Sequence, residues 1–264
     1  MVAVVEVSLP KSWAELTQEQ LRFLLSAMCA INLSNKNIAY RSQEDYAAQT
    51  AAQVQTLCFF QWSGLSVVCP YGSGYLVRSD EMEFKLSADV IASAIEHLSW
   101  TKELPSQPIR LDEVDGVKAL PADISSGFSF DAWLACETFW QRYQSNPEDT
   151  LLRQMAAILY GKENINPDAP ETLGVFYWWA GVKNMVSSMF PSFFKSVSGS
   201  DDAVTSITYD DMRRNIDAQI RALTKGDITK EHEILSLDAI RALTELDAQA
   251  REYDELQRRY PTKQ

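Results

Sequence analysis

The stretch LGVFYWWAGVKNMVSSMF, residues 173–190, is the part of the sequence that decides the fold. A helix formed by these residues is apolar on nearly all sides, which is typical of the centre of a helical bundle. Over residues 173–194, Lys183, Asn184 and three serines interrupt the apolar run, which favours a buried core helix over a membrane span. Four consecutive aromatics, residues 176–179, point to all sides of such a helix, so we expect core packing, with a protein interface as the alternative.

Further helices are predicted on both sides of this stretch along the second half of the chain. Ser129 is a suitable N-cap for a helix that carries Trp133, Cys136, Trp140 and Tyr143. The sequence NPED at residues 146–149 places a proline at the first helical position and predicts a helix through Leu159. Thr208 is expected to cap a helix that runs to Lys225, with Gly226 just beyond its end.

The first half of the chain mixes strand and helix signals. Residues 3–8 alternate in the manner of a short strand, Thr17 and Gln20 have the spacing of a capping box, and Ser42 is expected to cap a second helix. Two apolar runs, 65–69 and 75–77, flank a loop with two glycines, which predicts a hairpin. A third strand at 83–86 and a helix capped by Ser87 are expected to follow.

These elements predict a predominantly α-helical α+β protein. The expected parts are a small α+β unit at residues 1–125, a helical bundle at 126–196 and a C-terminal helical hairpin at 205–264, with a flexible linker at about 197–204. Residues 101–127 lack a helical period, and Asp115-Gly116 predicts a short hairpin among them, so we expect the first boundary there. Whether the first two parts share one core is left open.

The last predicted helix, from Thr229 onward, carries an apolar stripe with spacings of three and four, close to a coiled-coil pattern. The stripe could be covered within the chain or by another copy of it, so a homo-oligomer is one alternative. Its members nearest the C-terminal end are the expected partner-binding residues: Leu243, Leu246, Tyr253 and Leu256.

Composition excludes several classes of partner. The net charge of −12 and the pI near 4.7 argue against nucleic acid and anionic membranes, which lysine and arginine bind, and would suit a basic partner. The first residues lack the pattern of a secretory signal, so we expect a cytoplasmic location.

Catalytic and metal-binding motifs are missing from the sequence, so we expect no enzyme, cofactor or metal. The four cysteines share no CxxC spacing and lie among apolar residues, which favours buried, reduced thiols. The run that begins at His232 lacks the second histidine of a zinc-binding HExxH motif. Phosphate-binding loops and a nucleophile elbow are absent as well. An enzyme or regulator whose site is built from scattered residues is the alternative.

Three stretches resemble proteins of Bacteroidetes prophages that are encoded in tail modules near the tape measure protein. They are LPKSWAELTQEQLRFLL (residues 9–25), WWAGVKNMVSSMFPSFF (178–194) and the helical segment 211–256. Together they comprise 80 of the 264 residues, at the start, middle and end of the chain, and hold no catalytic residue. The resemblance implies a tail-assembly role in the host cytoplasm, such as a chaperone that binds the tape measure protein. The alternative is a virion subunit for tail completion or connection.

Overall fold

The structure is a computed structural model that describes residues 6–80, 82–197 and 209–260, and the side chains of 196, 197 and 209 are left out of the description. The described residues form ten α-helices, three short 3-10 helices and five strands, which confirms a predominantly helical α+β fold. The chain divides into two compact units. Unit 1 comprises residues 1–105 and 168–174, and unit 2 comprises 106–167 and 175–264, so residues 106–125 lie with the helices that follow them.

Two long helices form the body of unit 1. They are α1 (Gln18–Asn35) and α2 (Gln43–Ser63), and they pack together along their apolar faces. Thr17 and Gln20 form the predicted capping box, and the Ser42 hydroxyl accepts the Asp45 N–H, which confirms both predicted starts. Between the helices, the buried Asn35 amide donates to Thr50 and Gln53.

A three-stranded antiparallel sheet follows in the order β1 (Ser66–Tyr71), β2 (Gly74–Ser79), β3 (Met82–Leu86). The predicted hairpin is confirmed, but its two glycines have different reasons to be there. Gly72 adopts a φ of 60°, which the turn requires. Gly74 has no positive φ; a Cβ at this position would collide with the carbonyl oxygen of Leu86.

Unit 1 also corrects two expectations. Residues 6–8 of the strand predicted at 3–8 form no strand, and the rest of it lies outside the described residues. Ser87 occupies the N-cap position of α3 (Ala88–Glu96), yet its side chain makes no capping hydrogen bond. The remaining elements of this unit are the 3-10 helices η1 (Trp13–Glu15) and η2 (Ser99–Lys102).

Unit 2 is helical apart from a two-stranded hairpin, β4 (Glu113–Val114) and β5 (Val117–Lys118), at the predicted position. Its helices are α4 (Phe130–Ser145), α5 (Asp149–Leu159), α6 (Ala169–Met189, in this unit from Val175), α7 (Pro191–Val197), α8 (Tyr209–Thr224), α9 (Glu231–Leu235) and α10 (Ala239–Arg259), with the 3-10 helix η3 (Ile228–Lys230) before α9. The Ser129 hydroxyl caps α4 as predicted. In contrast, α5 begins at Asp149 after Glu148, so Pro147 is not its first residue. The predicted linker at 197–204 and the Thr208 cap lie almost wholly outside the described residues.

The core of unit 2 lies around α6, as its apolar sequence predicts. Trp178 and Trp179 are fully buried, and their indole N–H groups donate to the Ala122 carbonyl and to the Glu137 carboxylate. The ring of Trp179 lies 5.3 Å from that of Trp133 on α4. In the described part of the chain, no helix is both long and apolar enough to span a membrane.

The C-terminal segment is not one helix from Thr229, because the chain breaks between α9 and α10. Phe130 N–H donates to the Leu237 carbonyl, and Ala239 N–H donates to the Phe128 carbonyl. These two bonds place the start of α10 beside the start of α4. Asp238 then caps α10 by accepting the Arg241 N–H. A competing pairing with residues far away in the sequence therefore interrupts the helix that the stripe predicts.

Candidate functional site

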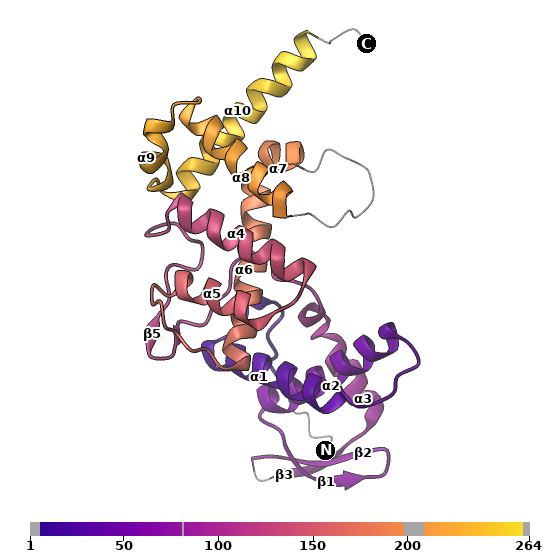
Figure 1. The fold of residues 1–264 in the computed structure, drawn as a ribbon. Helices are drawn as coiled ribbons and strands as arrows, with labels where there is room; N and C mark the ends of the chain where they lie inside the picture. The colour runs from indigo at the N-terminus through magenta and orange to yellow at the C-terminus, as the bar shows by residue number, and fades with distance from the viewer. Residues whose placement is uncertain (1–5, 81, 198–208, 261–264) are drawn as a thin grey trace. The chain divides into compact units, whose positions relative to one another are not determined.

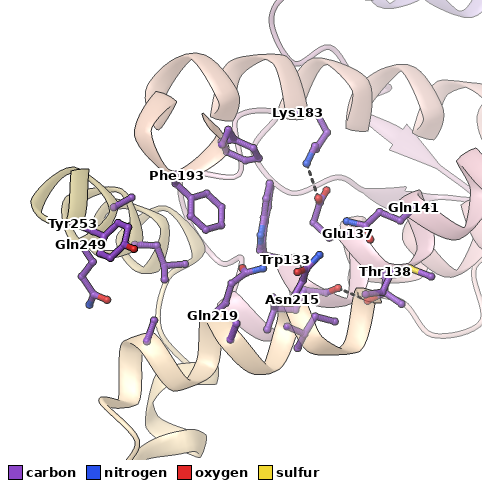
Figure 2. Close-up of a pocket in the computed structure, with 18 residues that line it drawn as sticks. Trp133, Glu137, Thr138, Gln141, Lys183, Phe193, Asn215, Gln219, Gln249 and Tyr253 are labelled. Carbon is purple, nitrogen blue, oxygen red and sulfur yellow. Dashed lines mark hydrogen bonds and ion pairs between the residues drawn. The ribbon is translucent and has the colours of Figure 1, made fainter. Parts of the chain in front are cut away.

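A pocket of about 540 Å³ lies within unit 2, between α4, α6, α7, α8 and α10. The residues from α4, α8 and α10 recur at spacings of three and four, so that one face of each of these helices lines the pocket, and α6 and α7 add Lys183, Phe193 and Phe194. Figure 2 shows these side chains converging from the surrounding helices. The lining consists of Trp133, Leu134, Glu137, Thr138, Gln141, Lys183, Phe193, Phe194, Met212, Asn215, Ile216, Ala218, Gln219, Ala222, Leu246, Gln249, Ala250 and Tyr253.

Apolar and aromatic side chains form most of the wall. Trp133 of α4 is buried against Trp179 of α6, and α7 contributes Phe193 and Phe194. Met212 of α8 and Leu246 of α10 are buried as well. Such a surface favours apolar occupants. Because the wall also contains aromatic rings and a methionine sulfur, it favours occupants that are themselves aromatic.

Among the residues that the structure describes, one ion pair supplies the charges of the lining. Lys183 Nζ lies 2.5 Å from Glu137 Oε2, and the Trp179 indole N–H donates to Glu137 Oε1 at 3.1 Å. The Lys183 ammonium also lies 4.9 Å from the centre of the Phe194 ring and 5.5 Å from that of Trp133. Both charged groups are mostly buried, so each satisfies the other and neither needs an external counterion.

Gln219 presents an unused hydrogen-bond acceptor. Its side chain rises from α8 toward Trp133 (Figure 2). The amide oxygen Oε1 is buried and has no hydrogen-bond partner among the residues that the structure describes. Buried polar atoms in proteins are nearly always paired, so an orphaned acceptor in a pocket wall is a candidate ligand contact.

The four residues predicted to bind a partner do not share one environment. Leu243 is 0% exposed, so a partner could touch it only if α10 moved, whereas Leu246 is 5% exposed and lines the pocket. Tyr253 and Leu256 are 62% and 56% exposed, and Tyr253 lies at the edge of the pocket. The stripe is therefore covered by its own unit at one end and uncovered at the other.

The pocket brings together residues that sequence reasoning did not select. Glu137 and Lys183 lie 46 residues apart and meet only in the folded unit. One signal pointed to them: Lys183 is a lone charge inside an apolar helix, and such a charge requires a partner. The sequence did not indicate a site residue at Gln219, because a glutamine on an amphipathic helix is common.

The remaining candidates from the sequence lie elsewhere. His97 and His232 are exposed, and among the described residues no group of histidine, cysteine and acidic side chains could hold a metal ion. Cys58 and Cys136 are buried, and burial raises the pKa of both thiols. Cys69 on β1 is exposed, which corrects the expectation of four buried thiols, while Cys29 is half-buried.

Comparison of the chain with protein-family models, with curated proteins and with solved structures gives no match.

Proposed function

We propose that the protein has a non-enzymatic, protein-interaction role in phage tail morphogenesis, in which it binds the tape measure protein or another tail component. The observation that carries the interaction part is the uncovered end of α10. Its apolar stripe continues from the buried Leu246 to the exposed Tyr253 and Leu256, and Tyr253 lines the pocket. The resemblance of three stretches to prophage tail-module proteins supports the biological setting.

The chemistry of the pocket supports binding over catalysis. Its polar lining, apart from Thr138 and Tyr253, consists of side-chain amides and one ion pair whose members neutralise each other. General acid–base chemistry needs a group free to exchange a proton with a substrate. Glu137 is already held by Lys183 and Trp179, so it is poorly placed for that role.

The surface around the stripe supports a helical partner. In α10, Ala239, Ala242, Leu243 and Leu246 face the rest of unit 2, and the C-terminal end of the helix projects from that unit (Figure 1). An amphipathic helix laid beside this segment would cover Tyr253 and Leu256 in the helix-in-groove manner. The net charge of −12 favours a basic partner.

Co-expression with a tape measure protein from the genome that encodes this chain tests the proposal. We expect the two proteins to co-purify, and we expect the double substitution Tyr253→Ser, Leu256→Ser to reduce the recovered partner several-fold. The matched control is Leu33→Ser, Val90→Ser, which changes two exposed apolar residues of unit 1. An unbound, insoluble tape measure protein would contradict the chaperone form of the proposal.

Purified phage particles separate a chaperone from a virion subunit. A protein that only escorts another during assembly is absent from the finished particle. We therefore expect mass spectrometry of purified particles to find the tape measure protein without this chain. A stoichiometric amount of this chain in the particles would instead identify a structural subunit.

A further inference from the structure

We propose that the pocket of unit 2 binds an uncharged aromatic side chain that carries an N–H donor, namely the indole of a tryptophan presented by the partner protein. The inference rests on the proposed interaction role. It names the anchor, meaning the side chain of the partner that inserts into the pocket. It follows from the size of the pocket, the balance of its charges and the unpaired oxygen of Gln219.

The size and the lining select an aromatic anchor. A volume of about 540 Å³ lies within the range of sites that enclose a small organic group. Trp133, Phe193 and Phe194 provide ring faces and edges, and Met212 provides a polarisable sulfur. Aromatic anchors buried in such pockets supply much of the binding energy of protein interfaces, and tryptophan is the most enriched among them.

The charges select a neutral anchor. Glu137 and Lys183 are the charged residues of the lining, and each already faces the other at 2.5 Å. A lysine, arginine or carboxylate that entered the pocket would lose its water without gaining an unpaired counterion. A neutral ring leaves the ion pair intact and adds to the packing against Trp133.

The orphaned oxygen selects an N–H donor. Gln219 Oε1 is buried without a donor among the described residues, and its side chain belongs to the lining of the pocket. An indole offers one N–H donor and no acceptor, so it satisfies this oxygen without bringing an unsatisfied acceptor of its own. A phenylalanine ring would leave Gln219 unpaired, and a tyrosine hydroxyl would add an acceptor to an apolar wall.

The test titrates the full-length protein with N-acetyl-tryptophanamide and with its 1-methyl-indole derivative, which lacks the donor but keeps the ring. Side-chain amide and methyl resonances of the protein, followed by NMR, report the site of binding. We expect saturable shifts at Gln219, Met212 and Leu246, and at least about fivefold tighter binding of the N–H form. Shifts that do not saturate, shifts outside the pocket, or equal binding of the two probes would overturn the inference.

Substitution of the acceptor supplies a second measurement. In Gln219→Leu the pocket keeps its apolar wall and loses the oxygen, so we expect the two probes to bind equally. The matched control, Gln61→Leu, alters an exposed glutamine of unit 1 and should keep the preference for the N–H form. A preference that survives in Gln219→Leu contradicts the assignment. The two-probe comparison in the unmodified protein decides the matter even if this variant folds poorly.

The inference and the proposed function fail in distinguishable ways. If the tape measure protein co-purifies equally with the unmodified chain and with Gln219→Leu, and the indole probe does not bind, the interaction role stands and the indole site falls. If the indole probe binds in the pocket but the tape measure protein does not co-purify, the site stands and the proposed partner falls.

Discussion

The carboxylate of Asp247 on α10 accepts the backbone N–H of Ser192, at 2.9 Å, in the first turn of α7. The same oxygen, Oδ1, accepts the Phe193 N–H at 3.0 Å, so one side chain caps a helix that is 55 residues away in the sequence. A negative charge at a helix N-terminus also interacts favourably with the helix dipole. This contact holds α7, and with it Phe193 and Phe194, against the pocket.

Removal of that cap should destabilise unit 2. We expect Asp247→Ala to lower the free energy of unfolding by about 1–3 kcal/mol, because two partly buried N–H groups lose their acceptor. Asp247→Asn should cost less, since an amide oxygen can still accept. Urea unfolding followed by circular dichroism measures both. Glu252→Ala, on the exposed side of the same helix, is the control, and an equal loss in that variant would contradict the capping role.

A methyl group added at Gly181 should destabilise the protein although it lies in a helix. An alanine normally stabilises a helix by about 1 kcal/mol relative to glycine. Here the new Cβ would lie 2.5 Å from the Gln107 carbonyl oxygen and 2.9 Å from Pro108 Cα, and backbone atoms yield poorly. We expect Gly181→Ala to lose about 1–3 kcal/mol in thermal or urea unfolding. A stabilised variant would show that the approach of residues 107–108 to α6 is looser than described.

The thiols should react in the order of their exposure. Cys69 is exposed and should be labelled first by iodoacetamide, whereas Cys58 and Cys136 should be labelled only when the protein unfolds. Peptide mapping by mass spectrometry after timed labelling checks the order. Early labelling of Cys58 in the native protein would contradict its burial.

The raised pKa of Cys58 also predicts a pH dependence of stability. Burial raises this pKa from about 9 to about 12, so between these values the unfolded chain releases a proton that the native chain retains. The contribution of Cys58 is complete below pH 9 and declines as the pH rises toward 12. We expect Cys58→Ala to be destabilised at pH 7 by lost packing, and its stability to fall less steeply between pH 9 and 11. The measurement is urea unfolding at each pH, and parallel curves would contradict the prediction.

Asp115 should titrate below the usual range of an aspartate. The hydrogen bond from Lys162 at 3.0 Å and that from the Asn166 N–H lower the pKa of this carboxyl. The stability that Asp115 contributes is present above its ordinary pKa and is lost as the pH falls through the lowered value. NMR titration of the Asp115 carboxyl carbon measures the shift directly. We expect Lys162→Met to raise the pKa and Lys118→Met, the control nearby, to leave it nearly unchanged.

Much of the local structure followed from short-range signals. The capping box at Thr17, the cap at Ser129 and the hairpins at 72–73 and 115–116 depend on residues within a few positions of each other, so local sequence suffices to predict them. The central position of residues 173–190 followed from their apolar character alone. The signal failed at Pro147 and Ser87, where a suitable residue occurs but the helix begins later or makes no side-chain cap.

The candidate site depends on contacts that no local pattern encodes. Glu137, Lys183 and Gln219 come from three helices, and the ion pair and the unpaired oxygen exist only because these helices pack together. The break of the C-terminal stripe before Ala239 likewise comes from pairing with residues 128–130.

The sequence by itself determined the helical α+β class, most of the hairpins and caps, and the amphipathic stripe of the last helix, because periodicity and capping act over one or two turns. Only the tertiary structure decided which part of that stripe is available. Leu243 and Leu246 are buried by the neighbouring helices, whereas Tyr253 and Leu256 stay exposed. The physical reason is that burial depends on where another helix ends in space, which the spacing of apolar residues along one helix does not specify.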